Sequence, residues 1–369
     1  MERTVVSLST AGREKALSDT FARIDSNGKP LAIIYFSEFE NFEYYTEELY
    51  KKYPEAVSIG STTYINFSTG GTSRTGLSVM AIFSGIEISA GAIHDISTYP
   101  MSHVDEIKNA VSKLSSTENT CCLEFTSAFS NGEEIILDTF KEGLDGSGIV
   151  LAGSTAGAKE GLHGTKVALN GIVFNNTCVF ALIHNLNGKI FIHKQNLFKP
   201  TNHTFMVTDV DCEHRVIYEY DNEPAADVLA KSLNLSLEEL SNKKCFYPVG
   251  RIKGKDIMIT SLDRIDPDGS IVCYSRVYNN TKQTLLTFGN FDAAMLEIMA
   301  SIRSRIHNCS FVIGVQCISN CIVLEKERLF DYYTKTLKDN FTNFIGIAGY
   351  GEQYYNNHLN QAVITIAFE

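Results

Sequence analysis

The sequence lacks a long hydrophobic run, a basic cluster and a secretion signal. No apolar stretch among its 369 residues approaches the roughly 20 residues needed to span a bilayer. The N-terminus, Met1-Glu2-Arg3-Thr4, has no long apolar segment of the kind that a signal peptide needs. The net charge is −11, and no Lys/Arg cluster overrides it, which argues against nucleic acid as a partner. These absences predict a cytoplasmic protein without a membrane span.

The sequence also lacks any cysteine spacing typical of a disulfide framework or a metal site. Nine cysteines is an odd number, and Cys178, Cys245 and Cys273 lie in apolar surroundings, as free buried thiols often do. Cys317-x-x-x-Cys321 resembles neither a redox motif nor half of a zinc site. We therefore expect a reducing cytoplasm, no metal and no cofactor.

Length and composition favour two folded domains. A chain of 369 residues is too long for one ordinary core, and 44% hydrophobic residues with 11% aromatics allow large buried cores. Over residues 202–215 the apolar pattern of strands and helices gives way to polar and charged residues, which indicates a domain boundary. We predict domains at residues 1–212 and 213–369.

The most informative feature is a repeat over about residues 31–100 and 121–200. Each copy has an apolar run, a Ser-x-Phe-x-Asn motif at 37–41 or 127–131, a helical stretch, and then a Gly-Ser-Thr sequence. A duplicated unit with these residues in the same place predicts two matching polar loops on one scaffold. Paired apolar segments follow at 77–93 and 178–192, each of which we predict to be a two-stranded hairpin.

Apolar residues at helical spacing predict amphipathic helices between the strands. A third, diverged unit has a strand at 311–319, a glycine-rich turn at 346–351 and a closing strand at 361–368. Strands that alternate with helices and hairpins predict an α+β fold, with mixed sheets packed together and helices on their outer faces. The predicted helices cover 13–24, 42–53, 102–114, 136–144, 290–306 and 329–337.

The two Gly-Ser-Thr sequences, Gly60-Ser61-Thr62 and Gly153-Ser154-Thr155, have two interpretations. Glycine at the end of a buried strand permits a sharp turn and close approach of a ligand, and the hydroxyls suit carboxylate or phosphate oxygens. Alternatively, the residues form a tight turn whose hydroxyls satisfy their own backbone. Two copies in equivalent positions favour the ligand more than one copy would. Thr63 extends the first loop.

The third turn carries a carboxylate. Glu352 could meet a ligand's ammonium group, and Gln353, His358 and Asn360 could reach the same space. The alternative is a solvated Glu352, a surface His358 and an Asn360 that caps a strand. Tyr350 is expected to form part of the wall.

Catalytic arrangements are weak. Neither Ser61 nor Ser154 lies in a Gly-x-Ser-x-Gly elbow. Cys317 with His358 could form a thiol pair, but an apolar strand raises the pKa of a cysteine. The glycine turns lack the Gly-Lys-Ser/Thr ending of a phosphate loop. We therefore do not expect an enzyme.

Over nearly its whole length the chain resembles the FIST family (F-box and intracellular signal transduction). Residues 59–63 and 152–157 are similar to the two glycine turns of the N-terminal FIST part. Tyr220-Asp221-Asn222-Glu223-Pro224-Ala225 resembles the segment that opens the C-terminal part. Gly349-Tyr350-Gly351-Glu352-Gln353, followed by Asn360-Gln361, is similar to the family's terminal Tyr-Gly-Glu-Gln and Asn-Gln motifs.

The resemblance has one departure. Cys317 stands where such strands often carry a cysteine, but Asn320 stands where an arginine is expected a few positions later. If that arginine holds an acidic group of the ligand, this chain binds something less acidic or binds it differently.

The resemblance implies a small-ligand sensory domain in signal transduction, with amino acids or related metabolites as the ligand class. It also implies an output partner such as a kinase, chemotaxis or cyclic-nucleotide module. The alternatives are a protein-interaction scaffold and a serine-dependent hydrolase or transferase. The ligand is expected between the first two turns and the third, where polar groups converge. Its predicted contacts are Gly60, Ser61, Thr62, Thr63, Gly153, Ser154, Thr155, Cys317, Asn320, Gly349, Tyr350, Gly351, Glu352, Gln353, His358 and Asn360.

Overall fold

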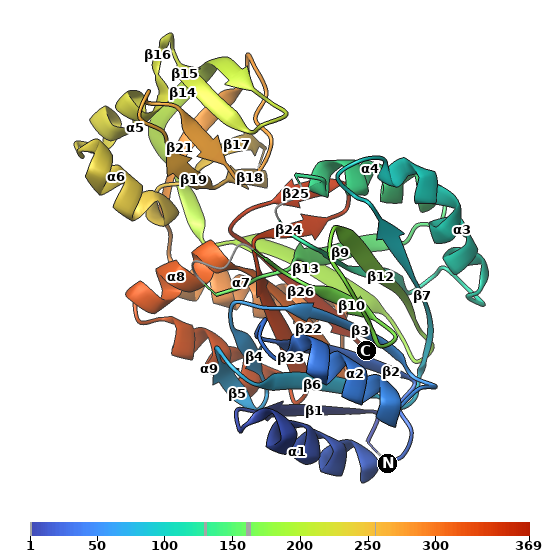
Figure 1. The fold of residues 1–369 in the computed structure, drawn as a ribbon. Coiled ribbons are helices and arrows are strands. Elements are labelled where there is room, and N and C mark those ends of the chain that lie inside the picture. The colour runs from blue at the N-terminus through green and yellow to red at the C-terminus, as the bar shows by residue number, and fades with distance from the viewer. Residues whose placement is uncertain (1, 129–130, 160–163, 255) are drawn as a thin grey trace.

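The computed structural model describes residues 2–128, 131–159, 164–254 and 256–369, and Figure 1 shows its arrangement. Within these ranges, nine α-helices and 26 strands form several mixed sheets. The predicted α+β class is confirmed. None of the described helices is both long and apolar enough to cross a membrane.

The first sheet has the strand order β1-β6-β2-β3-β10-β11. Its centre is a parallel pair, β2 and β3, joined through helix α2, whereas its other pairs are antiparallel. The strands are β1 (Thr4–Ser9), β6 (Leu77–Ile82), β2 (Ala32–Ser37), β3 (Val57–Thr62), β10 (Val167–Leu169) and β11 (Ile172–Phe174). The helices are α1 (Arg13–Asp25) and α2 (Phe42–Lys52).

The second sheet has the order β25-β24-β9-β8-β12-β7, with β8 and β9 parallel. Its strands are β25 (Asn357–Leu359), β24 (Gly351–Tyr354), β9 (Val150–Thr155), β8 (Thr120–Thr126), β12 (Thr177–Asn185) and β7 (Ile86–His94). The associated helices are the 3-10 turn η1 (Pro100–His103), α3 (Val104–Ser112) and α4 (Glu133–Gly143).

The third sheet has the order β13-β26-β22-β23-β4-β5, with β22 and β23 parallel. Its strands are β13 (Ile190–Asn196), β26 (Ala362–Phe368), β22 (Phe311–Cys317), β23 (Phe344–Gly349), β4 (Asn66–Ser68) and β5 (Gly71–Ser73). Its helices are α7 (Phe291–Arg305), α8 (Ile318–Lys326) and α9 (Phe330–Asn340).

The three sheets share one pattern and exchange short hairpins in a ring. In each sheet a parallel pair is flanked by two antiparallel strands on one side and a two-stranded hairpin on the other. Hairpin β4–β5 follows β3 of the first sheet but completes the third. Hairpin β10–β11 follows β9 of the second sheet but completes the first. Hairpin β24–β25 follows β23 of the third sheet but completes the second.

This exchange corrects two predicted hairpins. Within residues 77–93, β6 pairs with β1 and β2, whereas β7 belongs to the second sheet. Within residues 178–192, β12 belongs to the second sheet and β13 to the third. Strand propensity and apolar content are the same in either arrangement, so the local sequence did not reveal that the chain passes from one sheet to the next.

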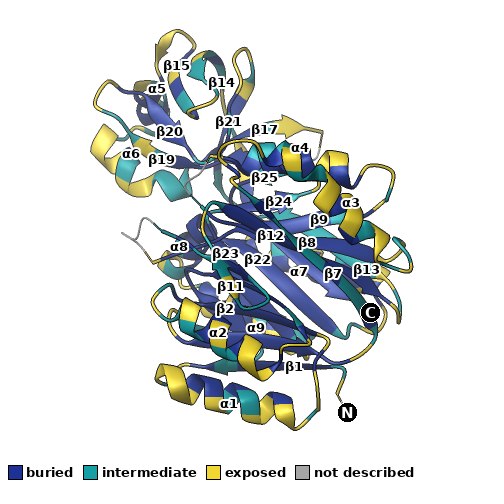
Figure 2. Cartoon of the chain, turned by 45° about the vertical axis from the view of Figure 1, so that its right-hand side comes forward, coloured by how far each residue is buried: buried dark blue, intermediate teal, exposed yellow. Residues whose placement is uncertain are grey.

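The period-2 pattern of each strand divides its side chains between two cores. Ala32, Ile34 and Phe36 of β2 face a central core shared by all three sheets, in which the ring of Phe36 meets that of Phe125 edge-on at 5.3 Å. Ile33 and Tyr35 face the opposite side, where α1 and α2 cover the sheet. Helices α3 and α4 cover the second sheet, and α7, α8 and α9 cover the third. Figure 2 shows buried strands inside and helices with exposed outer faces.

A fourth sheet forms a smaller part of the molecule apart from these three, at the upper left of Figure 1, and for that reason we call it the small sheet. Its order is β18-β17-β21-β14-β15-β20-β19, with β16 paired to β15. Its strands are β14 (Phe198–Asp211), β15 (Val216–Tyr220), β16 (Glu223–Pro224), β17 (Val249–Lys253), β18 (Asp256–Thr260), β19 (Leu262–Ile265), β20 (Ile271–Cys273) and β21 (Lys282–Phe288). Helices α5 (Ala225–Leu233) and α6 (Leu237–Lys243) pack on it, and the 3-10 turn η2 (Lys244–Phe246) follows α6.

Candidate functional site

The three predicted turns meet where the carboxyl ends of the three parallel pairs converge. The backbone N–H of Gly157 donates to the carbonyl of Thr62 (3.0 Å), and that of Tyr350 donates to the carbonyl of Thr155 (3.1 Å). The backbone N–H of Tyr64 donates to the carbonyl of Ala348 (3.0 Å). These bonds link the segment that follows each parallel pair to the end of a strand in one of the other two pairs. The structure thus brings the predicted residues of all three turns together, although in a joint between sheets and not around an open loop.

The two Gly-Ser-Thr sequences are strand ends, which corrects the prediction of polar loops. Ser61 and Thr62 belong to β3, and Ser154 and Thr155 belong to β9. Neither Gly60 nor Gly153 has the positive φ that a sharp glycine turn would require. The reason for glycine is space: a Cβ on Gly60 would lie 2.3 Å from the ring of Tyr35, and one on Gly153 would lie 2.4 Å from the carboxylate of Glu124.

A Gly60→Ala substitution is expected to lower the free energy of unfolding by about 1–3 kcal/mol or more. The ring of Tyr35 has no room to withdraw, because its hydroxyl donates to Thr46 Oγ1 (2.8 Å) and it stacks on Phe42. Urea unfolding would measure the loss. Gly12→Ala is the control, since a Cβ there meets nothing within 4 Å. Equal stability of both variants would contradict this explanation of Gly60.

The hydroxyl groups of the first two turns have partners inside the protein. Ser61 Oγ donates to the carbonyl of Thr62 (3.0 Å), and Ser154 Oγ donates to that of Thr155 (3.0 Å). Thr155 Oγ1 accepts from Gln353 Nε2 (2.8 Å), and Thr62 Oγ1 accepts from the backbone N–H of Lys166 (3.1 Å). This geometry matches the interpretation in which the hydroxyls satisfy local backbone.

Thr63 has a similar role at the same joint. Its Oγ1 donates to the carbonyl of Ile65 (2.8 Å) and accepts from the backbone N–H of Ala348 (2.9 Å). Gly349 and Gly351 permit close packing here. A Cβ on Gly349 would lie 2.0 Å from the carbonyl of Thr155, and one on Gly351 would lie 2.3 Å from the ring of His358.

The residues predicted around the third turn form a buried polar cluster. Gly351, Glu352 and Gln353 lie in strand β24 and not in a glycine-rich turn, which corrects the predicted local structure. Glu352 is fully buried, and its Oε2 accepts from the backbone N–H of Ala362 (2.9 Å). Asn320 Nδ2 donates to the carbonyl of that same Ala362 (3.4 Å) and to Gln316 Oε1 (3.0 Å).

Several polar atoms of this cluster have no hydrogen-bond partner. We define the third-turn cluster as Gln316, Cys317, Asn320, Glu352, Asn360 and Gln361. Among its atoms, Glu352 Oε1, Asn320 Oδ1, Gln316 Nε2 and Gln361 Oε1 are buried without a partner. Leaving a buried polar atom unpaired costs about 1–3 kcal/mol. Such a concentration is uncommon in a packed core and is typical of a functional site.

Burial also sets the protonation of the cluster. It raises the pKa of Glu352 well above its ordinary value, and the backbone N–H of Ala362 and the Cys317 thiol offset only part of this. Burial, followed by the neighbouring Glu352, raises the pKa of Cys317 as well, which makes its thiol a poor nucleophile. Asn320, at the position where an arginine was expected, supplies no positive charge to the carboxyl group.

The small sheet covers the third-turn cluster. The backbone N–H of Ser261 donates to Asn360 Oδ1 (3.1 Å), and Gln361 Nε2 donates to the carbonyl of Cys245 (2.7 Å). His358 Nε2 lies 3.2 Å from the carbonyl of Tyr274, to which it donates. The ring of Tyr350 stacks on that of Tyr274 at 6.5 Å. Tyr350, His358 and Asn360 therefore join the small sheet to the three-sheet body.

Sequence reasoning missed Gln316, Gln361 and Ser261. The signal for Gln316 is a lone amide at the end of the apolar run Phe311–Cys317, in which every residue is buried. Gln361 was part of a recognised motif but was not assigned to the site. Ser261 had no local signal, because only the tertiary fold brings the small sheet to this cluster.

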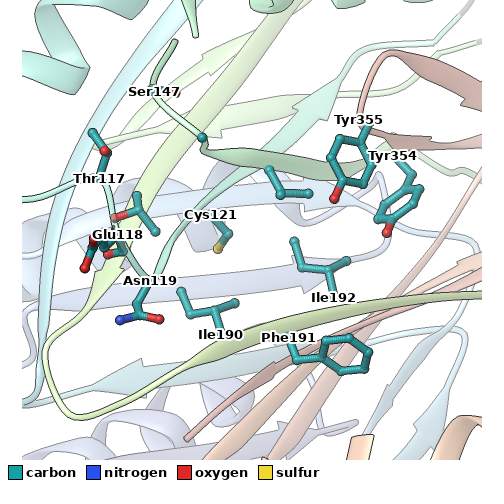
Figure 3. A pocket seen from close by; sticks show the side chains of 13 residues that line it. Thr117, Glu118, Asn119, Cys121, Ser147, Ile190, Phe191, Ile192, Tyr354 and Tyr355 are labelled. Atoms are coloured by element: carbon teal, nitrogen blue, oxygen red, sulfur yellow. Dashed lines mark hydrogen bonds between the residues drawn. The ribbon is translucent and has the colours of Figure 1, made fainter. Parts of the chain in front are cut away.

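A hollow beside the second sheet lies away from the third-turn cluster. Figure 3 shows this cavity of about 410 Å³, where the rings of Tyr354 and Tyr355 lie close together and Ile192 of β13 faces them. None of the predicted ligand contacts lines it. Among the described residues, no three His, Cys, Asp or Glu side chains gather in a set that could hold a metal ion.

Comparison with known families gives two adjacent matches. A family model described as the FIST N domain matches residues 30–223, and one described as the FIST C domain matches residues 225–355. The first of these alone spans more than half of the chain. No curated protein matches the sequence.

Proposed function

We propose, from the premise that this chain belongs to the FIST family, that its third-turn cluster binds the small ligand of a sensory domain. FIST domains are sensory domains in signal transduction. The observation that carries the proposal is the fully buried carboxyl group of Glu352, whose Oε1 has no partner in a cluster with three further unpaired polar atoms.

The chemistry of the cluster favours a ligand that donates hydrogen bonds. Three of its four unpaired atoms are oxygens, which accept hydrogen bonds. An ammonium group would meet the Glu352 carboxylate, and such a cation favours the ionised form of a carboxyl group whose pKa burial has raised. An amino acid or related metabolite has this group. With Asn320 in place of an arginine, the cluster favours a ligand that is less acidic.

Signalling follows from the position of the small sheet. A ligand in the third-turn cluster would lie against Ser261 and Cys245, so its binding would change the contact between this sheet and the body. A ligand shifts an equilibrium only by its differential affinity for two arrangements. We propose that the occupied cluster favours one arrangement, which an output partner of the kinase, chemotaxis or cyclic-nucleotide class reads in the cytoplasm. We also propose that the chain consists of two domains, residues 1–212 and 213–369.

A panel of amino acids, organic acids and nucleotides, screened by thermal unfolding, tests the function. A ligand at 100 times its Kd should stabilise the protein by about 2.7 kcal/mol. Glu352→Gln, which resembles the protonated side chain in shape, should fold normally and lose this shift. Glu238→Gln, an exposed change on α6, should keep it. The proposal fails if no compound stabilises the protein, or if Glu352→Gln binds as tightly as the unaltered chain.

A further inference from the structure

A second cavity, separate from the third-turn cluster, opens at the carboxyl ends of β2 and β3. Its volume is about 460 Å³, and no residue of the third-turn cluster lines it. We call it the α2 cavity, because helix α2 forms one wall. In open α/β sheets, ligands bind outside the carboxyl ends of parallel strands, and this cavity lies at such a position. The residues that matter most here are Arg13, Glu38, Phe39, Tyr45, Tyr64 and Arg74.

Two side chains of the α2 cavity present buried polar atoms without partners. Glu38 is only 9% exposed; its Oε1 accepts from Asn41 Nδ2 (2.5 Å), but its Oε2 has no partner. Tyr45 is fully buried, and its hydroxyl oxygen has no partner either. Burial, reinforced by the charge of Glu38, raises the pKa of Tyr45 to about 12, so this hydroxyl keeps its proton at neutral pH. Both groups can accept hydrogen bonds from one ligand.

Three cations border the α2 cavity: the exposed Lys159, and Arg74 and Arg13, which are engaged elsewhere. Arg74 pairs with Glu325 (2.6 Å) and lies over the ring of Tyr64 (4.3 Å). The guanidinium of Arg13 lies over the ring of Tyr44 (4.7 Å). Their side chains are 46% and 54% exposed, so water screens their charges. Among the residues that line the cavity, all in the described part of the chain, Glu38 is the only charged side chain that is buried.

We propose that the α2 cavity is a binding site for a small organic cation, whose ammonium or guanidinium group donates to Glu38 Oε2 and the Tyr45 hydroxyl. A buried carboxylate is strongly stabilised by a cation that satisfies its free oxygen. Phe39 and Tyr64 also line the cavity, and aromatic side chains suit the apolar body of an amine. This site shares no residue with the third-turn cluster, although Thr63, one of the predicted ligand contacts, lines it.

Isothermal titration of the full chain with agmatine, putrescine and tyramine tests this site. At least one of the three should bind with one-to-one stoichiometry. The anion 3-(4-hydroxyphenyl)propionate, which matches tyramine with its charge reversed, should not bind. Glu38→Gln removes the charge at nearly constant shape and should weaken amine binding at least tenfold, whereas Tyr45→Phe should weaken it several-fold.

The matched control is Glu40→Gln, the same change two residues along the same loop but at an exposed side chain that also borders the cavity. The Glu40→Gln variant should bind amines with an affinity within about twofold of that of the unaltered chain. Glu352→Gln should also leave the amine affinity unchanged, which separates this site from the third-turn cluster. Failure of all three amines to bind, equal binding by Glu38→Gln, or equal losses in Glu38→Gln and Glu40→Gln would overturn the proposal. If Glu38→Gln fails to fold, the charge-reversed probe and Tyr45→Phe still decide the result.

Discussion

Replacing Glu124 with glutamine is expected to stabilise the protein by on the order of 5 kcal/mol at about pH 9 and by almost nothing below about pH 4.5. Glu124 lies in the middle of β8, fully buried against Cys178 and the glycine at position 153. Its Oε2 accepts from Thr126 Oγ1 (2.8 Å) and from the Cys178 thiol (3.3 Å), but its Oε1 has no partner. Burial raises its pKa to about 8.

The direction of this pH dependence follows from proton linkage. The ordinary pKa of a glutamate is 4.5, and that of Glu124 in the folded protein is about 8. At a pH between these two values, the folded protein holds a proton on Glu124 that the unfolded chain has released. The stability is therefore highest below about pH 4.5 and falls as the pH rises to about 8. The gap between the two values is worth on the order of 5 kcal/mol at 1.36 kcal/mol per pKa unit. Glutamine does not titrate, so the variant avoids this loss.

Urea unfolding of both proteins across the pH range measures the effect. Glu118→Gln, an exposed change shortly before β8, is the control and should give a curve parallel to that of the unaltered chain. If the stability of Glu124→Gln changes with pH in the same way as that of the unaltered chain, the carboxyl group of Glu124 is not protonated in the folded protein and the explanation is wrong.

The second large effect is expected where the small sheet meets α4. Arg215 Nη2 contacts Glu133 Oε2 (2.7 Å) and Glu134 Oε2 (2.5 Å), and its Nη1 donates to the carbonyl of Tyr274 (2.9 Å). The Arg215 side chain is only 6% exposed. Replacing both acids with glutamine leaves a buried guanidinium without a counter-charge, which should cost about 3–5 kcal/mol. The small sheet should then lose hydrogen-exchange protection before the three-sheet body does.

The control for this pair of substitutions is Glu142→Gln on the same helix. Glu142 lies 3.7 Å from Lys108 in an exposed pair, and its loss should cost about 0–1 kcal/mol. Burial opposes the ionisation of Glu134, but His358, Arg215 and the backbone N–H of Arg276 together lower its pKa. The stabilisation that Glu134 provides is thus fully present above its pKa in the unfolded chain and is lost as the pH falls through its pKa in the folded protein. A double variant as stable as Glu142→Gln would show that the buried pairs do not hold the small sheet.

Periodicity predicted most of the local structure. The stripe of apolar residues at 13–24 corresponds to α1, and that at 42–53 corresponds to α2, which ends one residue earlier. The sequence Asp266-Pro267-Asp268-Gly269, whose residue types are typical of turns, connects β19 and β20. Helices depend on contacts three and four residues apart, so a local pattern is sufficient. The partners of β7 and β13 depend on segments far away in the chain, and nothing in their own residues specifies those partners.

The candidate site was predictable only in part for the same reason. Resemblance to a family led to Cys317, Asn320, Glu352 and Asn360, and the structure brings these four into one cluster. The ligand role of the first two Gly-Ser-Thr sequences remains a prediction, since the same residues are explained by the ring of Tyr35 and the carboxyl group of Glu124. Glycine as space for a neighbouring side chain cannot be distinguished in a sequence from glycine as access for a ligand.

The exchanged hairpins affect how the chain must be made. The third sheet combines β4 and β5, near the start of the chain, with β22, β23 and β26, near its end. During synthesis, about 270 residues must therefore follow β5 before β23, the partner strand of β4, has been made. Unpaired strand edges in such a waiting chain promote aggregation, and contacts between distant segments slow folding. Expression of this protein should consequently benefit from slower translation or from chaperones that shield nascent β-structure.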